Sequence, residues 1–328
     1  MNIAVVARGI ACAALLTGVA VPAAAQNAAA YPQRPVRFIV PYPPGGTTDI
    51  VARGIALPLA ERLGQQVVVD NRGGASTIIG AELVARAAPD GYTLLLTTAT
   101  TMSINPQVVK KLPYDPARDF APVSPAVYFP YVIGAHPAAA VNSVRELIDL
   151  AKAKPGALKY STPGSGSTNH LAGALLESMA NIRLTHVPYK GSGPALTGML
   201  SGEVELIITG IATVLPHTKT GKAKIIAVCG EKRLASWPDI PAVGEAGLKG
   251  YEGGTWFGVV TTAGVPRPIV DRLNRDIVAS LDSAVLKERF TALGFEVFTS
   301  TPEAFGQFIR TDMARAAKVI RSAGITVD

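Results

Sequence analysis

Short apolar runs alternate with amphipathic segments along most of this chain. In the segments between the runs, apolar residues recur every three or four positions, a spacing typical of helices. The clearest helical patterns lie at 143–154, 266–281 and 302–324. Such alternation predicts an α/β fold with two mainly parallel sheets and flanking helices. The predicted strands are 36–40, 67–70, 92–98, 131–135, 158–162, 184–189, 204–210, 224–229 and 256–262.

Four of the predicted strand-to-helix turns are rich in glycine and small hydroxyl residues. They lie at 43–49, 71–77, 162–170 and 189–195, so about 90 residues separate the first pair from the second. In parallel sheets such turns lie at the carboxyl ends of the strands, where ligands bind. We therefore expect two sheets that present these turns to each other across a ligand cleft.

Two proline-rich segments of weak periodicity, 115–130 and 236–257, interrupt the alternation. The closing helices, predicted at 266–290 and 302–323, need a sheet to cover. A discontinuous first lobe satisfies both observations, and two crossings between lobes would form a hinge. The predicted domains are lobe 1 at 31–125 and 256–328 and lobe 2 at 126–255.

The first 25 residues have the pattern of a cleavable secretory signal peptide: Arg8, then an apolar stretch, then Ala23-Ala24-Ala25. Cleavage after Ala25 lowers the formal net charge from +7 to +6 and leaves Cys229 as the only cysteine, so no internal disulfide is expected. Export argues against nucleic acid, ATP or NAD as partners. The lysines near turns are interpreted as a solvated surface.

The motifs of nucleotide and hydrolytic chemistry are missing from the sequence. No G-x-x-x-x-G-K-[ST], complete G-x-G-x-x-G or G-x-S-x-G segment occurs. The four histidines show no H-x-x-x-H or H-E-x-x-H spacing, which argues against a metal site. We predict no cofactor, no metal and no catalytic residue.

The glycine-rich turns do supply hydrogen-bond donors with little steric bulk. Gly45, Gly46 and Thr47 would expose N–H groups at one helix start, and Gly166, Ser167 and Thr168 at another. Two helix N-termini aimed into one cleft suit a carboxylate ligand. Asp49 complicates this interpretation because a carboxylate in the first turn could repel an anion. The alternative is that these turns are merely tight, with Ser167 and Thr168 as helix caps.

The mature chain resembles the Bug-type extracytoplasmic solute receptors, the binding component of tripartite tricarboxylate transporters. The resemblance rests on "RPVRFIVPYPPGGTTDIVAR", "NRGGAS", "AAPDGYTLL", "STPGSGSTNHLAGALLE" and "VPYKGSGPALTGMLSGEVEL", in that order. It implies a two-lobed, periplasmic-binding-protein-like architecture with a ligand cleft between the lobes. It also implies a non-catalytic periplasmic receptor that captures a small organic mono- or dicarboxylate, aromatic acids included, and delivers it to the membrane permease.

Two departures from the family pattern lie at Met102-Ser103, where a His-Ala pair is common, and at Thr209-Gly210, where many members have an aspartate. They make an amino-bearing ligand less favoured and leave room for a larger or more apolar acid. A periplasmic enzyme that uses His170 or Lys190 as a base, or a ligand-sensing lobe for a signalling partner, are the alternative functions. The ligand-binding residues implied by the resemblance are Tyr42, Pro44, Gly45, Gly46, Thr47, Ser103, Ser165, Gly166, Ser167, Thr168, Tyr189 and Lys190.

Overall fold

The computed structural model describes residues 31–323, so the predicted signal peptide lies outside the described residues. The first strands and helices alternate as the sequence predicts. β1 lies between β2 and β3, and all three strands are parallel. A π-helical turn, η2, and a short helix follow β3. The elements are β1 (Val36–Val40), α1 (Thr47–Leu63), β2 (Val67–Asn71), α2 (Ile78–Ala85), β3 (Thr93–Thr98), η2 (Thr100–Ile104) and α3 (Asn105–Val108).

A second set of parallel strands has β5 between β6 and β7. Helices follow these strands directly, so their N-termini gather at the carboxyl ends of the strands, as in other parallel arrangements. The elements are α4 (Val144–Ala153), β5 (Lys159–Thr162), α5 (Thr168–Ala180), β6 (Thr185–Pro188), α6 (Ser192–Leu200), β7 (Leu206–Gly210), α7 (Ile211–Thr218), β8 (Lys224–Val228) and the 3-10 turn η3 (Val243–Ala246).

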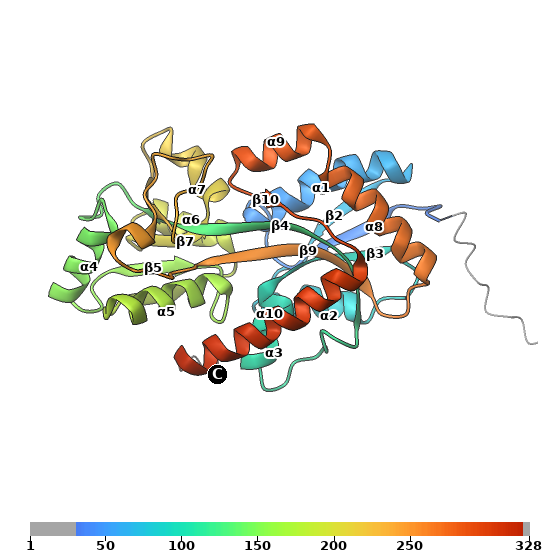
Figure 1. The fold of residues 1–328 in the computed structure, drawn as a ribbon, viewed down its shortest axis with the longest axis horizontal. Coiled ribbons are helices and arrows are strands. Elements are labelled where there is room, and N and C mark those ends of the chain that lie inside the picture. The colour runs from blue at the N-terminus through green and yellow to red at the C-terminus, as the bar shows by residue number, and fades with distance from the viewer. Residues whose placement is uncertain (1–30, 324–328) are drawn as a thin grey trace, which may run out of the picture.

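Two long strands, β4 (Phe120–Ala135) and β9 (Gly254–Thr262), join the two parallel sets. β4 pairs antiparallel with β9 along its first part and with β7 and β8 along its last part. Because β3 also pairs with β9, the strands within residues 31–323 form one continuous sheet of ten strands. Figure 1 shows β4 and β9 running through the middle of the molecule from one set to the other.

The first part of β4 differs from the sequence prediction, which treated 115–130 as an irregular boundary segment. Proline cannot donate a ladder hydrogen bond and is tolerated in sheets at edges and bulges. Here the pairing with β9 shifts register between Pro122 and Ser124 and again between Pro125 and Val127. These bulges accommodate the prolines. The predicted lobe boundaries, 125/126 and 255/256, fall inside β4 and β9, and the division into lobes stays a prediction.

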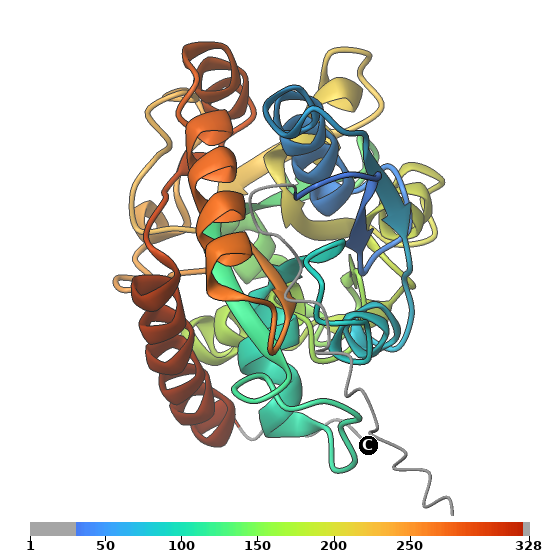
Figure 2. The ribbon, with the colours of Figure 1, turned by 90° about the vertical axis from the view of Figure 1, so that its right-hand side faces the viewer.

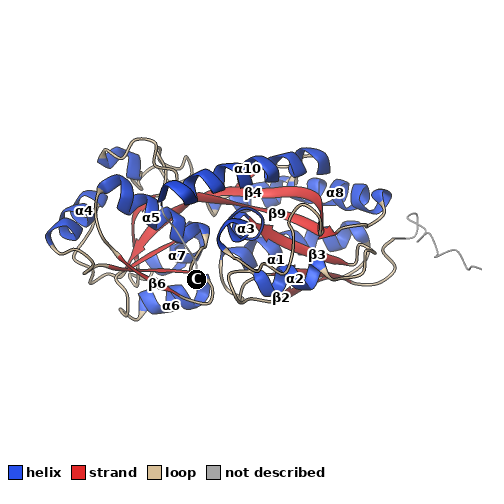
Figure 3. Cartoon of the chain, turned by 90° about the horizontal axis from the view of Figure 1, so that it is seen from below, coloured by secondary structure: helices blue, strands red, loops and turns tan. Residues whose placement is uncertain are grey.

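Three helices rather than two close the chain: α8 (Arg267–Leu281), α9 (Ala284–Ala292) and α10 (Pro302–Ala323), with β10 (Glu296–Val297) paired to β4. The helix predicted over 266–290 is interrupted because Ser283 caps α9, its Oγ accepting the N–H of Leu286. Helices α8 and α10 lie along one side of the molecule (Figure 2), and α10 extends along β4 (Figure 3).

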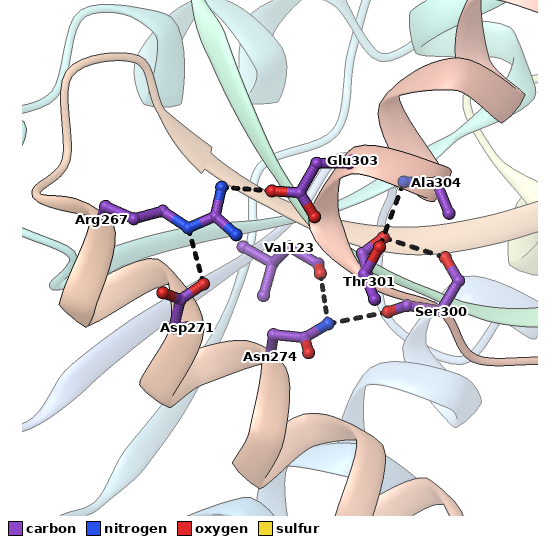
Figure 4. Close-up of polar contacts among 8 residues, drawn as sticks. All are labelled: Val123, Arg267, Asp271, Asn274, Ser300, Thr301, Glu303 and Ala304. Atoms are coloured by element: carbon purple, nitrogen blue, oxygen red, sulfur yellow. Dashed lines mark hydrogen bonds and ion pairs between the residues drawn. The ribbon is translucent and has the colours of Figure 1, made fainter.

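A polar cluster fixes the segment before α10 (Figure 4). The Nδ2 of Asn274 on α8 donates to the carbonyl oxygens of Val123 at 2.7 Å and Ser300 at 2.8 Å. Arg267 pairs with Asp271 and Glu303 beside it. One amide group therefore links α8, β4 and the start of the last helix.

Candidate functional site

The N-termini of four helices meet at one small cavity. Its volume is about 20 Å³, which is room for about one water molecule. The turns that lead from β1, β5, β6 and β7 into α1, α5, α6 and α7 bring these ends together. The residues at the helix starts that line the cavity are Thr47, Thr48, Thr168, Asn169, Ser192 and Gly210.

The rest of the cavity wall is built from hydroxyl groups and aromatic rings. Hydroxyl side chains come from the loops and strand ends, and Phe129 and Phe257 from β4 and β9. Burial raises the pKa of Tyr42 to about 12, against hydrogen bonds with Thr100 and Thr98 that lower it. The hydroxyl-bearing residues of this wall are Tyr42, Thr98, Thr100, Tyr131 and Thr209.

The turn between β1 and α1 requires two glycines for different reasons. Gly45 has φ +85°, a left-handed conformation that glycine adopts without a steric penalty. Gly46 is the N-cap of α1, and a Cβ there would lie 3.0 Å from the Cβ of Ser192 on α6. Among the described residues, no hydrogen-bond partner is found for the N–H groups of Gly46, Thr47 and Thr48. These donors therefore remain available at the start of α1.

Asp49 holds this turn together. Its carboxylate accepts the N–H of Gly45 at 3.1 Å, the Nε of Arg53 at 3.0 Å and the Nδ2 of Asn71 at 3.1 Å. Burial opposes its ionisation, but these hydrogen bonds outweigh burial and keep the pKa of the carboxyl below its usual value. The N–H of Gly45 is thus already used within the turn, and the charge of Asp49 is compensated by Arg53.

The turn between β5 and α5 uses most of its own donors. Ser167 caps α5: its Oγ accepts the N–H of His170 at 3.2 Å and donates to the carbonyl of Gly164 at 2.7 Å. The N–H of Gly166 points to Nδ1 of His170 at 3.3 Å. Thr168 differs, because its Oγ1 pairs with the hydroxyl of Tyr131 at the cavity wall. The sequence analysis gave helix capping as the alternative to anion binding by this turn, and Ser167 does cap α5.

Three hydrogen bonds join the two parallel sets of strands across the cavity. The hydroxyls of Thr47 and Thr213 lie 2.7 Å apart and are buried. The Oγ of Ser76 donates to the carbonyl of Ser165 at 2.7 Å. The N–H of Thr168 donates to Oγ1 of Thr100 at 3.3 Å. The glycine-rich turns predicted to face each other are therefore in direct contact.

The predicted ligand-binding residues fall into three groups. Tyr42, Thr47 and Thr168 line the cavity, while Pro44, Gly45, Gly46, Ser165, Gly166 and Ser167 form the adjacent turns. The remaining three predicted residues do not line it. Ser103 is fully buried in η2, Lys190 is exposed, and the ring of Tyr189 packs over Gly198 of α6.

Sequence reasoning missed several lining residues, among them Thr98, Tyr131 and Asn169. Thr209 also lines the cavity, and here the sequence did give a signal, because Thr209-Gly210 departs from the family pattern. Its Oγ1 is buried at the cavity and has no hydrogen-bond partner among the described residues. An unpaired buried hydroxyl is costly in a folded protein, so this one calls for an explanation.

His170, the candidate base, lies behind the turn rather than in the cavity. Its ring stacks on His186 with centroids 3.9 Å apart, and burial lowers its pKa.

Within residues 31–323, no group of three or more His, Cys, Asp and Glu side chains is placed to hold a metal. In the same range, no helix is long and apolar enough to cross a membrane.

The helix N-termini and hydroxyl groups meet between two sets of parallel strands, and two long strands connect the sets. This is the arrangement of a two-lobed solute-binding protein. The chain belongs to the tripartite tricarboxylate transporter family of receptors, whose family model matches residues 51–325. The predicted Bug-type resemblance is thereby confirmed.

Three similar proteins illustrate the relationship. BugT of Bordetella pertussis is 35% identical and covers 94% of this chain and 94% of its own. The structure of the periplasmic binding protein BugD is 36% identical, with a TM-score of 0.86 over 90% of this chain and 99% of its own. An R. palustris protein solved with adipate is 36% identical, with a TM-score of 0.88 over 90% of this chain and 99% of its own. The predicted periplasmic-binding-protein-like fold is confirmed.

Proposed function

We propose that this chain is a non-catalytic periplasmic receptor that binds the carboxylate group of a small organic acid at the cavity where α1, α5, α6 and α7 begin. The observation that carries the proposal is a cavity ringed by helix N-termini, whose lining includes Thr209 with a buried Oγ1 that has no hydrogen-bond partner among the described residues. An anion accepts hydrogen bonds from such groups and is stabilised by the helix dipoles.

The charges around the cavity support the same ligand class. None of the residues that line it is an aspartate, glutamate, lysine or arginine. A cationic ligand would find no counter-charge there, whereas a carboxylate would find the free N–H groups of Gly46, Thr47 and Thr48 close by. Adipate bound to the R. palustris relative is a carboxylate ligand of this kind.

Binding requires the two sets of strands to separate. A cavity of about 20 Å³ is too small for an organic acid. We infer that the hydrogen bonds of Thr47, Ser76 and Thr100 across the cleft break when the acid enters, and that β4 and β9 act as the hinge. The lobes at 31–125 with 256–328 and at 126–255 would then move as units.

The family implies that the loaded receptor delivers its ligand to a membrane permease. Cleavage of the signal peptide after Ala25 would release the mature receptor into the periplasm. His170 already contacts the N–H of Gly166 and the ring of His186, and Lys190 is exposed. These positions favour ligand binding over catalysis by His170 or Lys190.

A thermal-shift screen over aliphatic and aromatic acids tests the ligand class. An acid at 100 times its dissociation constant should stabilise the folded protein by about 2.7 kcal/mol. For a chain of this size the melting temperature should rise by a few degrees. If sugars or cationic amines raise the melting temperature while no acid does, the carboxylate proposal is wrong.

Gly46→Val tests the place of binding. The added methyl groups would press on Ser192 and crowd the N–H groups at the start of α1, so acid affinity should fall at least about ten-fold, a loss of about 1.4 kcal/mol. Gly230→Val is the matched control, because a Cβ there meets its nearest atom only at 3.5 Å. Equal affinity of both variants, each with a wild-type melting temperature, would exclude this turn from the site.

A further inference from the structure

A second, larger cavity lies beside the carboxylate site. Its volume is about 330 Å³, within the range of about 300–1,000 Å³ typical of small-molecule sites. It is lined by residues of η2, α5, the start of β9 and the middle of α10, and Figure 1 shows α10 passing close to α5 and α3. Its walls therefore include η2, which follows β3 of the first parallel set, and α5, which follows β5 of the second.

The walls of this cavity are mainly apolar. Leu171 and Leu175 lie one turn apart on α5, both half-buried, so each keeps apolar surface that a ligand could cover. Ile104 and Ala316 face them from η2 and α10, and Trp256 contributes from β9. Covering such surface is favourable for a hydrocarbon or aromatic group.

Thr168 belongs to both cavities, and two hydrogen bonds of this residue form the partition between them. Its N–H donates to Oγ1 of Thr100, and its Oγ1 pairs with the hydroxyl of Tyr131. β3 pairs with β9 only from Phe257 onward, so within residues 31–323 no strand pairs with residues 254–256 of β9 on that side. A ligand anchored in the first cavity can reach the second by displacing side-chain and N–H contacts, without breaking the sheet.

The charges in the second cavity disfavour another carboxylate. Asp312 is buried, and its oxygens accept the Nε1 of Trp256 at 2.8 Å and a guanidinium nitrogen of Arg315 at 2.9 Å. Arg315 is therefore paired, while the exposed Glu252 adds a negative charge at the same cavity. A ligand group that enters here should be uncharged.

We propose that the two cavities together bind an amphipathic monocarboxylate, with its carboxylate at the helix N-termini beside Thr209 and its aliphatic or aromatic body between α5 and α10. This inference rests on the carboxylate-binding function proposed above. It names the substrate class: an acid with one charged end and an apolar tail. Thr168 and Tyr131 are specificity-determining residues, because they separate head from tail.

The test compares propionate, hexanoate and adipate by calorimetric titration, with displacement of a tighter acid for weak ligands. Each methylene that enters an apolar chamber strengthens binding up to about four-fold. Hexanoate should therefore bind at least about ten-fold more tightly than propionate. It should also bind more tightly than adipate, which has the same six carbons but a second charge.

Leu175→Trp fills the second cavity and should weaken hexanoate at least about ten-fold while changing propionate affinity less than about two-fold. Leu57→Trp is the matched control, since Leu57 is 69% exposed on α1 and does not line this cavity. Leu171→Trp repeats the test from the neighbouring turn in case the first variant does not fold.

The outcomes separate the two proposals. A rise in affinity with tail length that Leu175→Trp or Leu171→Trp abolishes supports the tail chamber. Equal affinity for propionate and hexanoate, tighter binding of adipate, or identical loss in Leu57→Trp overturns it and leaves carboxylate binding intact. If none of the three acids binds and none of the wider acid screen does, both proposals fall.

Discussion

Asp49 illustrates how a residue that looks unfavourable for anion binding can support it. Its carboxylate accepts hydrogen bonds from Gly45, Arg53 and Asn71, and Asn71 also donates to the carbonyl of Tyr42 at 3.0 Å. The carboxylate of Asp49 therefore shapes the turn, and its charge is compensated by Arg53. The N–H groups of Gly46, Thr47 and Thr48, which precede Asp49, have no hydrogen-bond partner among the described residues and remain for the proposed ligand.

Thr209→Val tests the unpaired hydroxyl at the residue scale. Valine has nearly the same shape, so the substitution removes a buried hydroxyl that has no partner and should leave the free energy of unfolding unchanged or slightly higher. Acid affinity should fall by about 1 kcal/mol, because the ligand loses one hydrogen bond. Urea denaturation and calorimetric titration measure the two effects. A clear loss of stability would show that Thr209 has a structural partner instead.

At the scale of elements, the stacked rings of His170 and His186 hold α5 against β6. His186 also contacts the hydroxyl of Thr162 through Nε2 at 2.7 Å, which ties β6 to β5. Burial, and to a smaller extent the neighbouring His170, lowers the pKa of His186 from 6.5 to about 3. The folded protein therefore keeps this ring neutral over a pH range in which the unfolded chain would protonate it.

This difference predicts a loss of stability in acid. Between pH 6.5 and about 3 the unfolded state binds the proton and the folded state does not, so stability should fall as pH decreases through this window. His186→Gln should flatten that part of the stability curve, measured by chemical denaturation at a series of pH values. Thr197→Val, at an exposed position of α6 that carries no titratable group, is the control and should leave the slope unchanged. An unaltered slope in His186→Gln would argue against the buried neutral ring.

A second prediction concerns the junction of α8, β4 and α10. Asn274→Ala removes two hydrogen bonds and leaves the carbonyls of Val123 and Ser300 without this donor. The free energy of unfolding should fall by about 1–3 kcal/mol. Gln307→Ala on the exposed face of α10 is the control and should change stability by less than about 0.5 kcal/mol. Equal effects of the two substitutions would show that Asn274 does not join these elements.

For the whole molecule, the proposed separation of the two sets of strands predicts that the contacts across the cleft favour a closed arrangement over an open one. Thr213→Val leaves the buried hydroxyl of Thr47 without its partner, which costs about 1–3 kcal/mol in the closed arrangement only. The ligand-free variant should therefore have a larger radius of gyration by small-angle X-ray scattering than the wild type. A saturating acid should reduce it.

Thr197→Val is the control for this measurement, since Thr197 lies exposed on α6 and its hydroxyl donates to Gly193 of the same helix. Fluorescence of the buried Trp256, recorded after Trp237→Phe, gives an independent signal because Trp256 lies on β9 at the proposed hinge. An unchanged radius of gyration in Thr213→Val would mean that this hydroxyl pair does not control closure.

The sequence alone determined the parallel βα units, the glycine-rich turns at their ends and the family. Helical and strand periodicities and turn residues are local properties, so β1 to β3 and β5 to β7 lie close to their predicted positions. The same holds for Tyr42, Thr47 and Thr168, which belong to those turns and do line the cavity. A strand with three prolines was beyond this reasoning, because only its pairing with β9 reveals the bulges at Pro122 and Pro125.

The tertiary structure decided which polar groups face each other. Thr47 and Thr213 form a hydrogen bond although 166 residues separate them, and no spacing in the sequence announces such a pair. It also decided that Ser167 serves its own helix while Thr209 has an unpaired hydroxyl at the cavity. The apolar chamber between α5 and α10 likewise exists only where those helices meet. Hydrogen bonds and cavities depend on the positions of atoms from distant segments, and only the folded chain fixes those positions.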